Sequence, residues 1–172
     1  GLLNSSWLQP MMKILEQLPI FGTLLKKLPF LTAIFAGFEI LPKMAKKFQA
    51  AAEHACATGD WTQWSECFTE DAQYYEHHYG RFEGRQQILE WISTTMSEPI
   101  NCDMIDFPAD WYVIDEERGW VICAIWNVMR DPGDGSVHRE INWTKLHYAG
   151  NGQFSYEEDI YNPVEFGAMI KG

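Results

Sequence analysis

The sequence predicts an α+β domain in which helices pack on one face of a strongly bent antiparallel sheet. Before Pro99, apolar residues recur at helical spacing, whereas after Pro99 they alternate with a period of two. Clusters of Asp, Gly, Pro and Asn at 115–119, 131–135 and 150–152 separate the later segments, as turns separate the strands of a meander. Because the helices come first and the strands follow, the helices are expected to cover one face of the sheet.

Three helices are expected from residue 43 onward. The first carries its apolar residues on one face and ends at Thr58-Gly59; the second is a short helix after Asp60; the third opens at Gly84. The face of the first helix consists of Met44, Phe48, Ala51, Ala52 and Ala55. Strands are expected at 72–79, 111–115, 120–129, 137–148 and 154–161. A chain of 172 residues is about one domain long and buries a substantial core.

Residues 1–42 form an apolar arm that precedes the domain at 43–172. Prolines at 10, 19, 29 and 42 divide the arm, and because an interior proline breaks a helix, they predict several short helices. Residues 1–48 contain six lysines and two glutamates, while the rest contains seven basic and 22 acidic residues. The arm therefore has a role different from that of the acidic remainder.

Two roles for the arm fit its composition. Short basic helices rich in Leu and Phe are typical of peripheral membrane anchors, and they also suit docking to a protein partner. Alternatively, the arm packs on its own domain as a lid, or clasps a second subunit of a homodimer. No transmembrane span is predicted, because the longest uncharged run lies between Lys27 and Glu39 and is shorter than the roughly 20 residues that a bilayer requires.

The overall composition excludes several classes of function. The net charge of −11 argues against a nucleic-acid partner, since phosphate binding requires Lys and Arg. The four cysteines lack metal-ligand spacing and the five histidines are scattered, so no metal is expected, and no glycine-rich fingerprint indicates a nucleotide cofactor. Cysteines in such a chain are read as reduced thiols of a cytoplasmic protein, with a peripheral membrane location left open by the arm. The 15% aromatic content fits either an aromatic-lined pocket or subunit contacts.

Several motifs between residues 44 and 170 resemble the nuclear-transport-factor-two-like superfamily, especially its SnoaL-like branch. They are Gly59-Asp60 and the stretches at 68–72, 79–85 and 152–159. The resemblance implies a cone-shaped curved antiparallel sheet packed on three helices, here with an extra N-terminal helical arm. It also implies a pocket for a small molecule, without a cofactor. The fold hosts isomerases, cyclases, dehydratases, epoxide hydrolases and binding modules, so function depends on individual residues.

Each activity known for this fold depends on particular residues. Glu76 falls at the place of the ketosteroid isomerase base, but Ala52 and Thr144 stand where its oxyanion donors would be. Asp159 matches the late-strand acid of the epoxide hydrolases and of the SnoaL-like cyclases. The partners of the hydrolase Asp would be Asn127 and Ile125, which cannot form its Asp–Arg–Asp relay. For the cyclases, His138 lies near the start of the strand that should carry the His. Dehydratase chemistry needs two inward histidines, whereas His77 and His78 are adjacent and face opposite ways.

The resulting candidate site contains two catalytic carboxylates, Asp159 and Glu76. Carboxylates in an apolar cone acquire a raised pKa and can act as bases near neutral pH. The expected substrate-binding residues are Tyr74, Asn127, Asn142, Trp111, Trp126 and His78. The expected ligand is an apolar small molecule of the polyketide, terpenoid or steroid class. Three functions remain open: a cofactor-independent isomerase, cyclase, lyase or hydrolase; a non-catalytic ligand-binding protein; and an interaction subunit.

Overall fold

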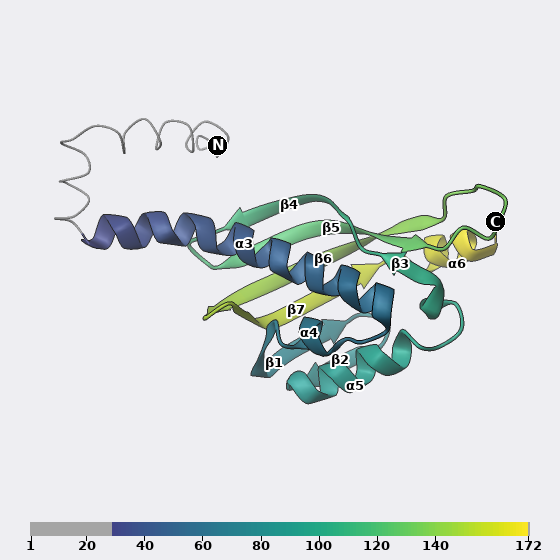
Figure 1. The fold of residues 1–172 in the computed structure, drawn as a ribbon, viewed down its shortest axis with the longest axis horizontal. Helices are drawn as coiled ribbons and strands as arrows, with labels where there is room; N and C mark the ends of the chain where they lie inside the picture. The colour runs from purple at the N-terminus through teal and green to yellow at the C-terminus, as the bar shows by residue number, and fades with distance from the viewer. Residues whose placement is uncertain (1–28, 172) are drawn as a thin grey trace. The chain divides into compact units, whose positions relative to one another are not determined.

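The computed structural model describes residues 29–171, with side chains from residue 41 onward. The chain divides into two compact units, residues 1–39 and residues 40–172. The first helix drawn in Figure 1 is α3 (Pro29–Thr58). The short helices expected before Pro29 lie outside the described residues. None of the described helices is both long enough and apolar enough to cross a bilayer.

The expected helix break at Pro42 is wrong. Helix α3 continues through Pro42, which lies in its interior. A proline there removes one backbone hydrogen bond and crowds the preceding turn. The adjacent Leu41 and Met44 are buried, with 4% and 7% of their surface exposed, and their packing offsets that local cost. The predicted apolar face of this helix is confirmed, since Phe48, Ala51, Ala52 and Ala55 are all buried.

The later helices follow the sequence pattern closely. The second is α4 (Thr62–Ser65), and the third is α5 (Arg85–Thr95), which begins after Gly84. The buried Ile88 and Ile92 lie on one side of α5, four residues apart. A fourth helix, α6 (Pro163–Lys171), was not expected from the sequence, and none of its residues is buried. A single 3₁₀ turn, η1 (Asn101–Asp103), follows α5 in the described chain.

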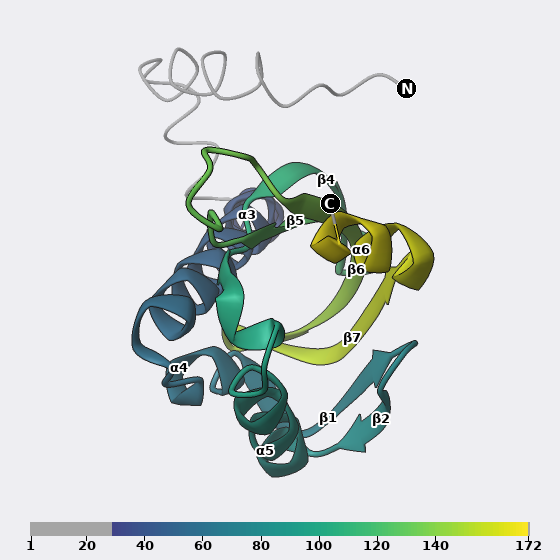
Figure 2. The same ribbon diagram turned by 90° about the vertical axis from the view of Figure 1, so that its right-hand side faces the viewer.

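The strands form one mixed, strongly curved sheet. In the described residues the strands are β1 (Phe68–Glu76), β2 (Gly80–Glu83), β3 (Met104–Asp106), β4 (Ala109–Asp115), β5 (Trp120–Met129), β6 (Arg139–Gly150) and β7 (Gln153–Tyr161). Their order is β2-β1-β7-β6-β5-β3, and β4 also pairs with β5. Figure 2 shows the sheet bending around an inner face, with the helices of residues 40–95 on that side. The predicted α+β class is thus confirmed.

One strand pair departs from the antiparallel prediction. β1 runs parallel to β7, whereas the other paired strands of the described sheet are antiparallel. The parallel pair joins strands separated by most of the domain, so it cannot be a hairpin. Through this pairing, the first and last strands of the described domain become neighbours in the interior of the sheet.

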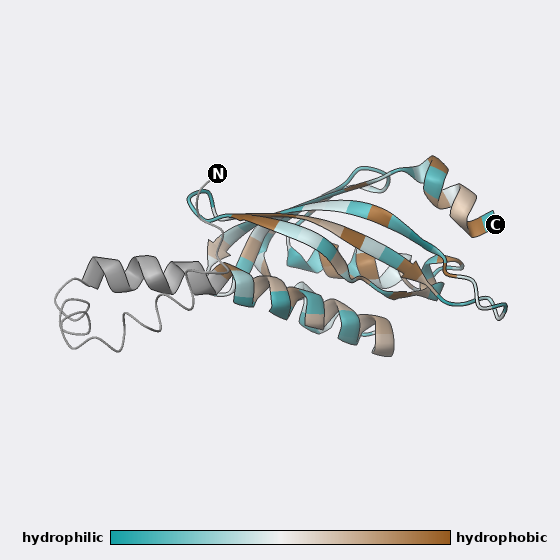
Figure 3. Ribbon diagram, turned by 90° about the horizontal axis from the view of Figure 1, so that it is seen from above, coloured by the Kyte–Doolittle hydropathy of each residue, from teal (hydrophilic) through white to brown (hydrophobic). Residues whose placement is uncertain are grey.

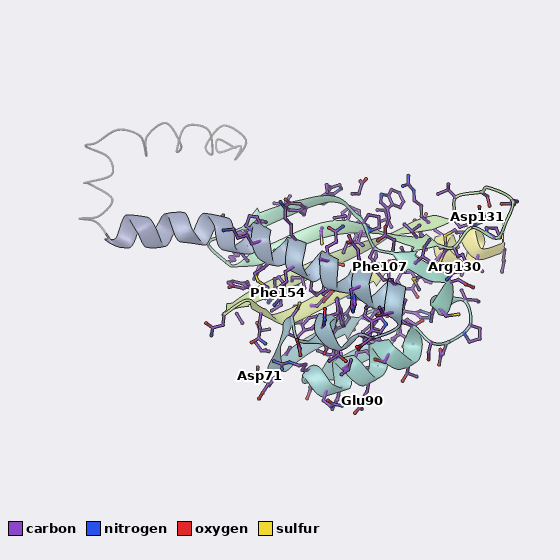
Figure 4. All side chains as sticks on the ribbon, viewed as in Figure 1. Asp71, Glu90, Phe107, Arg130, Asp131 and Phe154 are labelled. Atoms are coloured by element: carbon purple, nitrogen blue, oxygen red, sulfur yellow. The ribbon has the colours of Figure 1, made fainter. Side chains whose placement is uncertain are left out.

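A cluster of aromatic side chains fills the space between α3, α4 and the sheet. The ring of Phe48 on α3 lies 5.8 Å from that of Phe68 and 5.7 Å from that of Phe154. Both Phe68 and Phe154 are fully buried. Figure 3 shows hydrophobic and hydrophilic bands alternating along the strands. In Figure 4, Phe154 lies within the fold, whereas Asp71 and Glu90 point away from it.

The backbone conformation and the surroundings of Gly84 both disfavour a side chain at this position. Gly84 has φ 84° and ψ 146°, a region that only glycine adopts readily. Its amide donates to the carbonyl oxygen of Ala72 at 2.8 Å, and a Cβ atom would lie 3.2 Å from the carbonyl oxygen of Glu70. Gly59 also has a positive φ of 77°, but nothing lies within 4 Å of the position of its Cβ.

We expect Gly84→Ala to lower the free energy of unfolding by about 2–3 kcal/mol, because backbone strain and the contact with β1 add together. Gly59→Ala, the matched control, should cost only about 1 kcal/mol, from backbone strain alone. Urea unfolding followed by tryptophan fluorescence measures both. Equal losses in the two variants would contradict the role given to the Glu70 contact.

Candidate active site

A cavity of about 280 Å³ lies between the inner face of the sheet and the helices of residues 40–172. Its walls are mainly apolar and come from β1, from β3 to β7, from helices α3 to α6, and from η1 and neighbouring loop residues. Among the lining residues are the aromatic side chains Trp61, Trp64, Tyr79, Trp91, Phe107, Tyr112, Tyr161 and Phe166. Such a lining removes water from any polar group that it surrounds, which strengthens the electrostatic interactions of that group.

Four polar side chains lie close together on the neighbouring strands β1 and β7. Tyr74 of β1 lies opposite Glu157 of β7, and Glu76 lies opposite Asp159. Since alternate residues of a strand share a face, all four side chains are directed to the same side of the sheet. Each of the four lines the cavity. The parallel register therefore brings three carboxyl groups and one phenol together on the cavity wall.

Asp159 accepts hydrogen bonds at both of its carboxylate oxygens. The Tyr74 hydroxyl donates a short hydrogen bond to Oδ2, and the Thr144 hydroxyl donates to Oδ1 at 2.5 Å. The Asn142 amide in turn donates to the Thr144 oxygen at 3.1 Å, so the donors form a chain that ends on Asp159. Burial raises the pKa of Asp159 above its ordinary value, and the hydrogen bonds from Thr144 and Tyr74 partly counteract this.

Glu76 is fixed at one oxygen and unpartnered at the other. Its Oε2 atom accepts hydrogen bonds from the backbone amides of His78 and Tyr79, at 2.7 and 2.6 Å. Its Oε1 atom is buried and has no hydrogen-bond partner among the described residues. Burial raises the pKa of Glu76, against the lowering effect of the two amides. Glu76 is thus held rigidly with one acceptor directed at the cavity.

The cavity surrounds five of the predicted site residues, which come from four strands. Asp159, Glu76, Tyr74, Asn127 and Asn142 all line it. Asn142 lies beside Asp159 within the donor chain. Asn127 lines the cavity from β5, where its Cα partner is Glu140 of β6.

The other three expected substrate-binding residues do not line the cavity. Trp126 precedes the inward Asn127, and Trp111 precedes the inward Tyr112, so the alternation of the strands places both tryptophans on the outer face. Trp126 instead donates to Asp110 at 3.2 Å, and Trp111 packs on Trp143. His78 lies just beyond the end of β1, where its ring packs on those of Tyr79 and Tyr161. These three residues therefore lie outside the lining of the cavity, and their part in substrate binding stays a prediction.

Glu157 and Thr144 belong to the site although neither was among its predicted residues. Glu157 is two residues before Asp159, so strand alternation places both side chains on one face. Glu157 was not predicted as a site residue because residues 157–159 form an acidic run, and such runs are typical of solvated surface. The structure buries Glu157 to 3% exposure. Thr144 stood where a ketosteroid isomerase carries its acidic donor, and here its hydroxyl supplies a donor of a different kind. A threonine on an apolar strand gives no sequence signal by itself.

Other nucleophile and metal chemistry has little support in the described residues. Cys123 lines the cavity, but burial and the nearby carboxyls of Glu157 and Asp159 raise its pKa to about 12, which leaves it a neutral thiol. Within residues 41–171, no group of three or more His, Cys, Asp or Glu side chains is arranged to hold a metal ion. The polar groups that line the cavity are mainly carboxyls, hydroxyls and amides.

Comparison with known families identifies this architecture. The family model described as the SnoaL-like domain matches residues 48–147, which is more than half of the chain. The chain belongs to the SnoaL-like domain family. The matched region contains Tyr74, Glu76 and Thr144, while Glu157 and Asp159 follow it on the last strand.

Solved structures share the fold of this SnoaL-like protein at low sequence identity. It is similar to a putative isomerase from Bacillus subtilis, with a TM-score of 0.60 and 20% identity over 79% of this chain and 96% of that chain. It is also similar to the BvnE pinacolase from Penicillium brevicompactum, with a TM-score of 0.56 and 12% identity over 77% and 92%. A third is a hypothetical protein of ketosteroid isomerase-like fold from Catenulispora acidiphila in complex with trimethylamine, with a TM-score of 0.55 and 17% identity over 70% and 86%. A search of curated proteins gave no sequence match.

The neighbouring residues Glu157 and Glu158 should affect stability in opposite directions. Burial and the nearby Asp159 raise the pKa of Glu157 well above its ordinary value. The folded state therefore retains a proton that the unfolded state releases, so the free energy of unfolding falls as the pH rises above the ordinary glutamate pKa. We expect Glu157→Gln to stabilise the protein at pH 7, with a gain that shrinks toward pH 4.

Glu158→Gln is the matched control. On the outer face, hydrogen bonds from Lys145 and His77 lower the pKa of Glu158 to about 2. Its stabilising contribution is present above the ordinary glutamate pKa and is lost as the pH falls toward 2, so this variant should be less stable than wild type at pH 7. Urea denaturation between pH 4 and 8 measures both variants. A pH-independent gain in the Glu157 variant would contradict its raised pKa.

Proposed function

We propose that this SnoaL-like protein binds an apolar small molecule in its cavity and catalyses a cofactor-independent proton transfer on it, with Asp159 as the acid–base group. The observation that carries the proposal is the environment of Asp159. Hydrogen bonds from Tyr74 and Thr144 orient its carboxylate inside an aromatic cavity, whose burial raises its pKa toward the working range of a general base.

Each neighbouring residue has a distinct part in this proposal. Tyr74 and Thr144 hold the Asp159 carboxylate while leaving it free to accept a proton from a bound ligand. Glu76 lies across the β1–β7 pair, and its unpartnered Oε1 is a second acceptor on the same wall. Two carboxyls on neighbouring strands suit a reaction that removes a proton at one position and returns it at another. An isomerase, cyclase or lyase fits this pattern, and a hydrolase needs in addition a water molecule held between the two carboxyls.

The character of the lining supports a largely apolar ligand. The aromatic walls favour ring systems such as those of polyketides, terpenoids or steroids. The Oδ1 atom of Asn142 is a further buried acceptor without a partner in the described chain, so a hydroxyl or another donor on the ligand would be recognised there. The isomerase and pinacolase named among the structural neighbours support this class of chemistry only through the shared fold.

Turnover and binding by matched carboxamide variants test the proposal. Binding is followed by displacement of Nile red, a neutral dye, from the cavity by a panel of steroids, terpenoids and polyketides. The ligands that bind are then assayed for conversion by mass spectrometry. We expect Asp159→Asn to lower kcat about 10²–10⁴-fold, the usual contribution of general acid–base catalysis, while ligand binding changes only a few-fold.

Two further variants complete this design. Glu76→Gln should also reduce turnover if it carries the second proton. Glu90→Gln, at an exposed carboxylate on α5, should have no effect. Unchanged turnover in the Asp159→Asn, Glu76→Gln double variant would contradict catalysis by these groups. Binding by the wild type without any conversion would instead favour a ligand carrier.

A second surface supports self-association. Trp111, Trp143 and Ile160 lie side by side on the outer face across the register of β4 to β7, and Val113 and Ile122 lie beside them. Their exposed fractions lie between 38% and 57%. The adjacent Lys145–Glu158 ion pair gives this face both signs of charge, so a copy related by a two-fold axis can meet complementary groups. We propose that this face forms a homodimer.

Light scattering after size-exclusion chromatography tests the dimer. Wild type should run as a dimer and Trp143→Glu as a monomer, because a carboxylate in the centre of an apolar interface is costly. Val137→Glu, at an exposed position before β6, is the control and should stay dimeric. A monomeric wild type would refute the dimer.

A further inference from the structure

Glu157 is the most deeply buried carboxyl group of the cavity, and the proposed proton transfer at Asp159 does not use it directly. It is 3% exposed, and its Cα partners are Tyr74 on β1 and Leu146 on β6. None of the ion pairs found in residues 41–171 involves it. A buried carboxylate without a cationic partner is strongly unfavourable, so this position requires an explanation.

The hydrogen bonds around Tyr74 limit where the protons of Tyr74, Asp159 and Glu157 can lie. The Tyr74 hydroxyl carries a single proton, and its short contact with Asp159 Oδ2 uses it. The same phenolic oxygen lies 3.5 Å from Glu157 Oε1. If Glu157 were ionised, two acceptors would face each other across this gap, whereas a protonated Glu157 can donate to the phenolic oxygen. Hydrogen-bond counting therefore favours the neutral acid.

We propose that Glu157 is a positioning residue that stays protonated at neutral pH and donates a hydrogen bond to Tyr74, which in turn directs the tyrosine proton onto Asp159. The resulting chain runs from the Glu157 hydroxyl to the Tyr74 hydroxyl and ends on the Asp159 carboxylate. Its significance for catalysis rests on the proposed function of Asp159. The chain itself does not depend on that function.

The groups that face Glu157 support a neutral state. They are Tyr74 and Glu76 from β1, Asp159 from its own strand, Thr144 from β6, Cys123 from β5 and Cys67 before β1. All are acidic or uncharged at neutral pH. Lys46 lines the cavity from α3, but its side chain belongs to the exposed surface. With like charges nearby and no counter-charge, burial raises the pKa of Glu157.

A neutral Glu157 has two effects on Asp159. Because Glu157 carries no charge, it does not repel the negative charge of Asp159 on the same strand face. Asp159 can therefore ionise while Glu157 does not. Glu157 also polarises the Tyr74 hydroxyl, because hydrogen bonds in a chain strengthen one another. Two carboxyls at positions i and i+2 of one strand thereby take different protonation states in the same cavity.

Carbon-13 NMR of side-chain carboxyls in the full-length protein tests this directly. In the wild type, the Glu157 carboxyl carbon, assigned by its loss in Glu157→Gln, should keep the chemical shift of the protonated acid at pH 7. Glutamine preserves a neutral donor, so the titration midpoint of Asp159 should stay close to that of wild type. An ionised Glu157 at pH 7, or a fall of one pH unit or more in the Asp159 midpoint of Glu157→Gln, would overturn the proposal.

A double-mutant cycle then separates positioning from general support of the fold. Tyr74→Phe should raise the Asp159 midpoint, since the charged form loses a donor. Glu157→Leu should raise it by a smaller amount, and should add nothing in the Tyr74→Phe background. Additive shifts would show that Glu157 does not act through Tyr74, and would refute the positioning role. The wild-type spectrum alone still decides the protonation state if Glu157→Leu fails to fold.

These measurements are independent of any substrate. If Asp159→Asn retains full turnover while the titrations behave as expected, the proposed function fails and the hydrogen-bond chain stands. If Glu157 is ionised while Asp159→Asn loses turnover, the proposed hydrogen-bond chain is refuted and the proposed function stands.

Discussion

The parallel pairing of β1 with β7 determines where the three carboxyl groups of the cavity and Tyr74 lie. Hairpins join consecutive strands in most other pairs of the sheet, but this pair connects the first described strand of the domain to the last. Its register sets Tyr74 beside Glu157 and Glu76 beside Asp159, and β6 then adds Thr144 opposite Asp159. Because sheet register fixes which side chains share a face, the cavity wall acquires its composition from backbone pairing.

Opposed influences set the state of each carboxyl on this wall. The aromatic walls of the cavity disfavour the charged form of all three carboxyl groups. How far the pKa of each one rises depends on the hydrogen-bond donors that it faces. Asp159 has two hydroxyl donors and Glu76 has two backbone amides, whereas Glu157 faces a phenol whose proton is already engaged. Similar burial therefore produces different acidities within one cavity, which is how a site obtains a base and an acid from the same residue type.

Local patterns in the sequence predicted the α+β class, the buried face of α3 and the inward direction of Asp159. Local patterns could not predict which distant strands pair, since no signal within residues 68–76 or 153–161 shows that these two strands run parallel. Strand alternation could have placed Trp126 outside, because the adjacent Asn127 was already assigned inside. Trp111 lies on a different strand, so its direction depended on the pairing of β4 with β5. β3 was missed because Phe107-Pro108 separates it from β4, and Pro42 was misjudged because the packing of Leu41 and Met44 is a tertiary effect.

Adjacent residues on β7 belong to different environments: Glu158 meets Lys145 and His77 on the outer face, while Glu157 and Asp159 face the cavity. A single inserted or deleted residue within this strand would exchange these environments, turning Glu158 inward and presenting its neighbours to solvent. In the turn before β7, where Gly150 and Gly152 have positive φ angles, a change of length can be absorbed without altering which residues face inward. Natural relatives should therefore differ in length at this turn and keep the spacing within the strand.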